Sequence, residues 1–391
     1  MNPRRRKFLR ETGAGFTGLA LASLLAEEGL LLRQLAKADA GDGHRIPEDL
    51  GRPGQAEELG AMVPCKAKYC IFLYMYGGPS QMDLFDYKPE LQRRDGETVR
   101  IELRRNDVKE GKLLGSKRKF QQCGESGLWC SDALPNLAKH MDKLAVIKSL
   151  YQDSFAHGSA NLQMNCGRII QGYPSLGSWL SYGLGTENRN LPNFVVLLDP
   201  RGGPIPGAPN WGAGFMEASH QGTILRTSSE PILDLRSFDP ISTQMQREQI
   251  DMLHALNAEH LSLRSESSEL EARIASYELA FQLQASAPEA LDLSTESQST
   301  LDAYGLNLPA GTHKLSLGPS VFGRQCLIAR RLIERGVRFV QIYSGGGHQQ
   351  QNWDAHFGVE ENLAIHSPEI DQPIAALLAD LEQRGLLDET L

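Results

Sequence analysis

The chain has 391 residues, of which 41% are hydrophobic and 23% charged, and this composition excludes a disordered protein. The formal net charge is −8. The first 40 residues hold seven basic and four acidic side chains, so the remainder carries −11. An acidic body argues against a nucleic-acid partner, which requires a basic patch. No apolar run approaches the ~20 residues of a membrane span, so we expect no stable span.

The N-terminus predicts export. Residues 5–10 (RRKFLR) closely resemble the twin-arginine motif, and a short, Gly-containing apolar stretch follows over residues 12–26. This pattern predicts that the twin-arginine translocase delivers the chain to the periplasm or to the outside. Residues 38–40 (ADA) fit a cleavage site, and an uncleaved anchor is the alternative. We therefore interpret residues 1–40 as a signal region and the Gly-, Pro- and Glu-rich residues 41–64 as a linker.

Four apolar runs predict strands that are buried on both faces, as in a parallel sheet. They are residues 69–75, 144–148, 193–198 and 337–343. Segments with helical spacing lie between them, and strands that alternate with helices are typical of an α/β fold. We therefore expect a doubly wound, mostly parallel sheet.

The predicted α/β domain covers residues 65–391. Apolar residues at three- and four-residue steps predict a helical hairpin inserted at about residues 243–285. A last helix is expected over residues 369–384, behind Ser367 and Pro368. Residues 386–391 then resemble the start of a fifth strand, which suggests that the C-terminal part of the domain is missing.

Ligands of open α/β sheets bind outside the carboxyl ends of the strands. Polar and charged side chains collect just after the apolar runs, and the candidate site residues among them are Asp83, His157, Ser159, Arg201, His348, Asp354 and His356. Carboxylates and imidazoles are ligands of zinc, manganese or calcium, so we expect a divalent metal site at this edge.

Each of these motifs also has a purely structural explanation. Asp83 fits a solvated loop or a helix cap, and Ser159 fits an ordinary cap of the helix expected over residues 160–166. A ligand at that helix start would face the positive end of its dipole, which suits an anion. Arg168 suits either a substrate anion or a structural ion pair. The loop that carries Asp354 and His356 indicates a functional site more strongly than the other motifs do, because polar groups in such a loop need hydrogen-bonding or metal partners.

Five segments resemble the domain of unknown function 1501 family, a group of exported bacterial proteins. They are residues 77–89 (GGPSQMDLFDYKP), 174–179 (PSLGSW), 276–281 (SYELAF), 352–356 (NWDAH) and 371–378 (DQPIAALL). The resemblance extends over nearly the whole chain. The family is usually placed in the alkaline-phosphatase-like, sulfatase-like superfamily, so the resemblance implies that fold and the metal-dependent hydrolysis of a sulfate or phosphate ester.

Residue by residue, Asp354 and His356 resemble the late metal loop of that superfamily. Residues 159–168 resemble the sulfatase nucleophile segment, and His157 stands at the nucleophile position, where a Cys, Ser or Thr is usual. Gly77 and Gly78 stand where the superfamily carries an acidic residue. Both positions depart from the sulfatase pattern, and the later ligand pair would lie beyond residue 391.

These observations lead to one assignment of roles. We expect a zinc, calcium or manganese ion to polarise an ester oxygen and to activate a water molecule. His157 or Ser159 would act as base or nucleophile, and Arg168 or Arg201 would neutralise the anion. The expected metal ligands are Asp354, His356, His348 and Asp83.

The expected partner is a small anionic ester or a sulfated glycan. Two other functions compete with the hydrolase. One is a non-catalytic descendant of the fold that binds a glycan or a protein in the same cleft. The other is an inactive, truncated fragment.

The export hypothesis is tested by replacing Arg5 and Arg6 together with Lys. A receptor that reads guanidinium geometry rather than charge alone will reject the pair, so the precursor should stay in the cytoplasm. Cell fractionation and immunoblotting of a bacterial host measure this, with Arg33→Lys as the control that leaves the motif intact. Undiminished export of the double variant would contradict the assignment.

Overall fold

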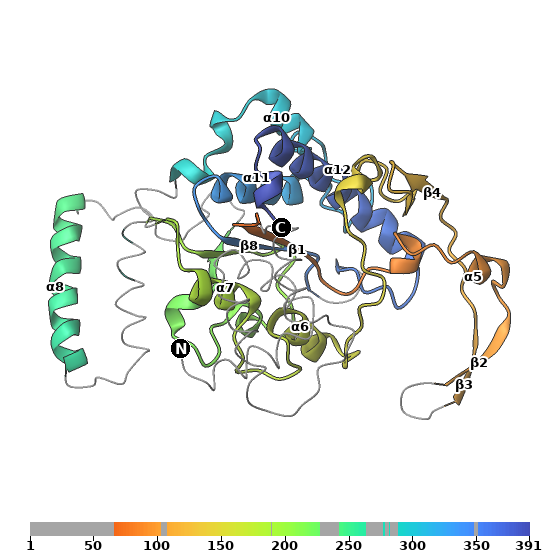
Figure 1. Cartoon of the computed structure of the whole chain (residues 1–391), viewed down its shortest axis with the longest axis horizontal. Coiled ribbons are helices and arrows are strands. Elements are labelled where there is room, and N and C mark those ends of the chain that lie inside the picture. The colour runs from red at the N-terminus through yellow and green to blue at the C-terminus, as the bar shows by residue number, and fades with distance from the viewer. Residues whose placement is uncertain are drawn as a thin grey trace, which may run out of the picture.

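The computed structural model describes residues 66–102, 108–188, 190–226, 242–262, 277, 281, 288–347 and 351–391. At its centre is a four-stranded parallel sheet with the strand order β1-β8-β6-β7 (Figure 1). The strands are β1 (Cys70–Met75), β8 (Phe339–Ser344), β6 (Phe194–Leu197) and β7 (Thr223–Leu225). Three of the four predicted strands are therefore confirmed, and they lie side by side in one α/β sheet.

The fourth predicted strand is corrected. Residues 144–148 form no strand but run irregularly after a short 3-10 helix, η2 (Leu137–Lys143). Leu144 and Val146 pack against the core, whereas Ile147 is exposed. Because this apolar run packs against the core on one side only, it does not need a position inside the sheet, where both faces are covered. The fourth strand of the sheet is β7 instead.

Both faces of the sheet are covered, because successive side chains of a strand point to opposite faces. Val195 and Leu197 of β6 join one apolar cluster, with α11 (Pro319–Ile333) and α12 (Val359–Gln383). Phe194 and Val196 join a second cluster, with α7 (Leu176–Leu184). Figure 1 shows α11 and α12 on one side of the sheet, and α7 with α6 (His157–Cys166) on the other. This is the doubly wound arrangement that the sequence predicts.

The last helix begins earlier than predicted. α12 starts at Val359 and contains both Pro368 and Pro373, so Pro368 does not mark its first turn. The residues around Pro368 are buried, and tertiary packing holds the helix together across a position where proline cannot donate a backbone hydrogen bond. At the other end of α12 the chain turns back, and Thr390 pairs with Tyr69 at the outer edge of β1.

Two hairpins and several short helices complete the described chain. The hairpins, which the sequence did not predict, are β2 (Thr98–Glu102) with β3 (Val108–Lys112), and β4 (Phe120–Cys123) with β5 (Leu128–Ser131). The remaining helices are η1 (Gln81–Asp83), α5 (Pro89–Arg93), η3 (Ala208–Trp211), η4 (Ala218–His220), α8 (Thr243–Ser262), η5 (Leu293–Thr295), α10 (Gln298–Ala303) and η7 (Leu387–Glu389).

The predicted helical hairpin falls only in part within the described residues. α8 lies where its first helix is predicted and stands apart from the sheet in Figure 1. Most of the predicted second helix lies outside the described residues, although Arg247 of α8 places its guanidinium over the ring of Phe281. The signal region and the linker also lie outside the described residues. Within the described part of the chain, no helix is long and apolar enough to cross a membrane.

A buried ion-pair network links the loops at the carboxyl edge of the sheet. Arg201 pairs with Asp199 at 2.8 Å and with Glu369 of α12 at 2.9 Å. Asp199 also accepts a hydrogen bond of 2.7 Å from the amide of Gly345, directly after β8. The sequence assigned Arg201 to a substrate anion, whereas its guanidinium is held between two buried carboxylates. Its role in the structure is to fix the loops after β6 and β8.

This network makes stability dependent on pH. Burial alone would raise the pKa of Glu369, but the hydrogen bond from His366 and the charge of Arg201 lower the pKa below its ordinary value of 4.5. A carboxyl group with a lowered pKa stabilises the fold above its unfolded-state pKa, and this stabilisation is lost as the pH falls through the folded-state pKa. We therefore expect the free energy of unfolding to decrease below about pH 4.5.

Glu369→Gln should lower the free energy of unfolding at pH 7 by about 1.5–3 kcal/mol, because Arg201 keeps Asp199 as its counter-charge but loses its charge-assisted hydrogen bonds to Glu369. The variant should also show a smaller decrease in the free energy of unfolding when the pH is lowered. Urea denaturation across a pH series measures both effects. The control is Glu382→Gln, which breaks an exposed pair with Lys143 and should cost less than about 1 kcal/mol. An unchanged acid dependence in Glu369→Gln would contradict the role of the network.

Candidate functional site

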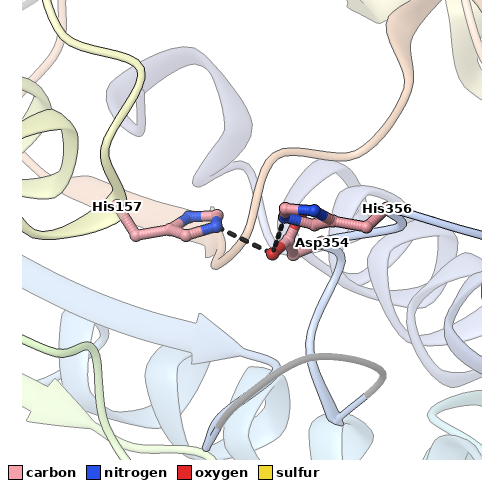
Figure 2. A group of neighbouring side chains, drawn as sticks. All are labelled: His157, Asp354 and His356. Carbon is pink, nitrogen blue, oxygen red and sulfur yellow. Dashed lines mark hydrogen bonds and ion pairs between the residues drawn. The ribbon is translucent and has the colours of Figure 1, made fainter.

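Three side chains from two distant parts of the sequence meet at the carboxyl edge of the sheet. Nε2 of His157 lies 2.8 Å from Oδ2 of Asp354, and Nε2 of His356 lies 2.9 Å from the same oxygen (Figure 2). The candidate ligand atoms all lie within 4.8 Å of one another. Asp354 is largely buried, and His356 is 71% exposed, so the group opens to solvent on the side of His356. We call these three residues the His–Asp–His cluster.

His157 is the first residue of α6, and buried polar groups hold that helix over the sheet. Tyr74 of β1 donates a hydrogen bond to the amide oxygen of Asn161. Gln341 of β8 donates one of 2.6 Å to Oδ1 of Asn165. Burial raises the pKa of Tyr74, so its hydroxyl keeps the proton that it donates. Because these bonds have fixed directions, they set the rotation and the position of α6, and thereby the direction in which His157 points.

Asp354 is held by a short loop after β8 that packs against the end of β1. The amide of Trp353 donates a hydrogen bond of 2.9 Å to the carbonyl of Tyr76. The amide of Asp354 donates one of 2.8 Å to Oδ1 of Asn352. The indole of Trp353 is buried and donates to Ser344 of β8 at 3.1 Å. The loop is therefore fixed up to the backbone of Asp354.

Gly77 permits this contact between the two loops. Its φ of +110° is one that side-chain-bearing residues rarely adopt. A Cβ atom at this position would lie 2.5 Å from Oδ1 of Asn352 and 2.5 Å from the amide nitrogen of Asp354. Only glycine fits at this position. The glycine that departs from the acidic residue of the sulfatase pattern is thus required by the packing of the Asp354 loop.

Tyr76 borders the cluster from the end of β1. Its buried ring lies 6.1 Å from the imidazole of His157. Burial raises the pKa of its hydroxyl, and the charge of Asp354 acts in the same direction, although a hydrogen bond that the hydroxyl accepts from the backbone amide of Ile205 opposes both. Tyr76 thus lies beside His157 and bonds to the loop after β6. Sequence reasoning missed it because it lies between the apolar run of residues 69–75 and the Gly77–Gly78 turn.

Of the other residues proposed from the sequence, those that the structure describes lie outside the cluster. Ser159 shares a hydrogen bond of 2.5 Å with Ser154, and Asp83 accepts one of 2.6 Å from Ser80. The guanidinium of Arg168 lies over the ring of Tyr173, 5.7 Å from its centre. Arg201 belongs to the ion-pair network described above. His348 lies outside the described residues.

The cysteines form no second site in the described part of the chain. The five described cysteines are buried free thiols, and Cys123 and Cys130 do not pair with each other. Burial raises the pKa of Cys130 and Cys166 to about 12, so both thiols stay protonated and unreactive.

The cluster has the donor set and the spacing of a metal site. Two imidazoles and one carboxylate are typical zinc ligands, and three protein ligands with an open fourth position are typical of catalytic zinc. Ligands at about 2.1 Å from a tetrahedral ion lie roughly 3.4 Å apart. The observed separations of 2.8 and 2.9 Å need to widen by only about 0.5 Å to admit an ion. The exposed position of His356 allows that movement.

The family model described as "Protein of unknown function (DUF1501)" matches residues 67–391, and the chain belongs to this family, as its motifs indicate. No curated protein and no solved structure matches the chain.

The role of Gly77 is tested by comparing a substitution at Gly77 with the same substitution at the adjacent Gly78. Gly77→Ala and Gly78→Ala both place a side chain at a positive φ, but a Cβ at Gly78 has no atom within 4 Å. The two variants therefore share the backbone strain, and only Gly77→Ala displaces the Asp354 loop. We expect Gly77→Ala to lower the free energy of unfolding by about 1–3 kcal/mol more than Gly78→Ala does, measured by urea denaturation. Equal losses would show that the close contact does not matter.

Proposed function

We propose that this member of the DUF1501 family is an exported, metal-dependent hydrolase of sulfate or phosphate esters. The observation that carries the proposal is the convergence of His157, Asp354 and His356 within 4.8 Å at the carboxyl edge of the sheet. Ligands of open α/β sheets bind at this edge. The resemblance of the motifs to the sulfatase-like superfamily supplies the class of reaction.

His157, Asp354 and His356 would hold the ion. Zinc fits this donor set best, manganese second, and calcium least, because calcium prefers oxygen ligands. A bound ion of this kind polarises an ester oxygen and lowers the pKa of water. In this proposal His157 is a metal ligand rather than the base or nucleophile. His348 is retained as a proposed fourth ligand. Asp83 is a weaker one, because Ser80 already occupies its carboxylate.

The start of α6 would stabilise the anionic group of the substrate. Ala156 precedes the helix and has no side chain that could accept a hydrogen bond from its first amides. The positive end of the helix dipole therefore faces the region beside His157, where an ester oxyanion would lie. Arg201 is held by two carboxylates, and Arg168 comes two residues after the end of this ten-residue helix, whose two ends are about 15 Å apart. Neither arginine is well placed for this role.

Ser159 lies in the first turn of α6 and remains the proposed nucleophile, although its hydroxyl pairs with Ser154. His157 stands where sulfatases carry a Cys, Ser or Thr nucleophile. This departure favours a second candidate function, in which the cleft binds an anionic ester or sulfated glycan without hydrolysing it. Delivery to the periplasm by the twin-arginine translocase is part of the proposal and rests on Arg5 and Arg6, which lie outside the described residues.

Asp354→Ala tests the metal site directly. Asp354 contributes the oxygen that both imidazoles face, so its loss should weaken zinc binding at least 100-fold, as measured by isothermal titration calorimetry of the full chain. The side chain supports no other part of the core, so circular dichroism and the midpoint of thermal unfolding should change little.

The control for this variant is His313→Ala. His313 is another half-exposed histidine, which pairs with Glu361 at 3.5 Å, and its loss should leave zinc affinity unchanged. Turnover of 4-nitrophenyl sulfate and phosphate by the zinc-loaded protein separates the two candidate functions. Binding of the anion without turnover would favour the non-catalytic protein. Failure of the unaltered chain to bind zinc, manganese or calcium would contradict both metal-dependent functions.

A further inference from the structure

Three large, exposed apolar residues lie near the His–Asp–His cluster, two of them in the chain and one in space. Phe155 is 85% exposed, Phe357 is 86% exposed and Ile205 is 53% exposed. Other phenylalanines of the described chain, such as Phe194, Phe322 and Phe339, are buried in the core. We call Phe155, Phe357 and Ile205 the apolar rim.

Each residue of the rim is joined closely to the cluster. Phe357 follows His356 directly in the chain, and Phe155 precedes His157 by two residues. The side chain of Ile205 lies 4.0 Å from where a Cβ on Gly158 would be, and Gly158 is the neighbour of His157. The backbone of Ile205 also bonds to the hydroxyl of Tyr76, whose ring faces His157. The rim therefore approaches the cluster from three separate loops.

This placement is informative because single exposed apolar residues are common on protein surfaces, whereas a group of them beside polar residues marks a binding site. The Arg201 network fixes the loop after β6, which carries Ile205, and Trp353 fixes the loop after β8, which leads to Phe357. Phe155 directly precedes α6, whose position is set by the hydrogen bonds of Asn161 and Asn165. An aromatic ring is suited to cover the flat apolar face of another ring. The occupant of the rim must also carry a group that the cluster binds.

We propose that the apolar rim binds a ring in the alcohol part of the ester, and that the site therefore takes ring-bearing sulfate or phosphate monoesters in preference to small alkyl esters. This inference rests on the proposed function, since the cluster and the start of α6 hold the anionic group while the ring lies against Phe155, Phe357 and Ile205. The shared chemistry is a ring with an apolar face, which the flat face of an aryl group and the C–H face of a sugar both present.

The test uses ligands that cannot be hydrolysed. Calorimetry of the zinc-loaded full chain compares phenylphosphonate with methylphosphonate, and benzenesulfonate with methanesulfonate. We expect the ring-bearing member of at least one pair to bind at least tenfold more tightly. A glucopyranosyl methylphosphonate gives the sugar arm, and its affinity relative to phenylphosphonate distinguishes the two sources of the ring.

Phe155→Ala and Phe357→Ala, singly and together, should reduce the ring preference toward one while leaving the affinity for the methyl ligands unchanged. Phe215→Ala is the matched control, because Phe215 is an exposed phenylalanine that contacts Tyr173 and Trp179 instead of the cluster. It should retain the full preference.

Three results would overturn the inference, and they are distinguishable. If zinc and the methyl ligands bind but the ring preference is absent, or is the same in the rim variants, the rim has no role in ligand binding and the proposed function stands. If none of the four anions binds to the zinc-loaded protein, the proposed function fails and the rim proposal fails with it. Self-association or vesicle binding that is lost in the rim variants, with no ring preference, would assign the rim to another occupant.

Discussion

The geometry of the candidate site depends on one close backbone contact, between the end of β1 and the loop after β8. The carbonyl of Tyr76 accepts a hydrogen bond from Trp353, and the absence of a side chain at Gly77 lets the amide of Asp354 approach. Because β1 and β8 are adjacent and parallel, their carboxyl ends lie at the same edge of the sheet. The contact converts this proximity of two loops into a fixed position for the Asp354 carboxylate.

The opposite side of the site depends on polar rather than apolar packing. Asn161 and Asn165 of α6 bond to side chains of β1 and β8, so the helix that carries His157 has a preferred orientation on the sheet. Apolar contacts alone would permit the helix to rotate or slide, because they have no direction. The Arg201 network supplies the same kind of directional constraint to the loop after β6. The ligand candidates are thus placed by hydrogen bonds, on a sheet whose own stability comes from apolar burial.

The central part of the fold and the meeting of His157 with Asp354 could be predicted from the sequence. β1, β6 and β8 are continuous apolar runs, and the topology of parallel strands brings their ends together. Residues 144–148 could not be distinguished from a strand, because an apolar run does not show whether one face or two will be covered. The second carboxylate that pairs with Arg201 belongs to Glu369, 168 positions away, and no local sequence pattern predicts this ion pair. The role of Gly77 depends likewise on a tertiary contact with residues 352–354.

The central claim is that His157, Asp354 and His356 form one metal site. Anomalous scattering at the zinc edge, from crystals of the full chain grown with zinc, tests it most directly. The account predicts one ion within about 2.0–2.2 Å of Nε2 of both histidines and an oxygen of Asp354, with a further position open to solvent. An ion bound elsewhere on the chain, with both imidazoles still hydrogen-bonded to Asp354, would contradict it.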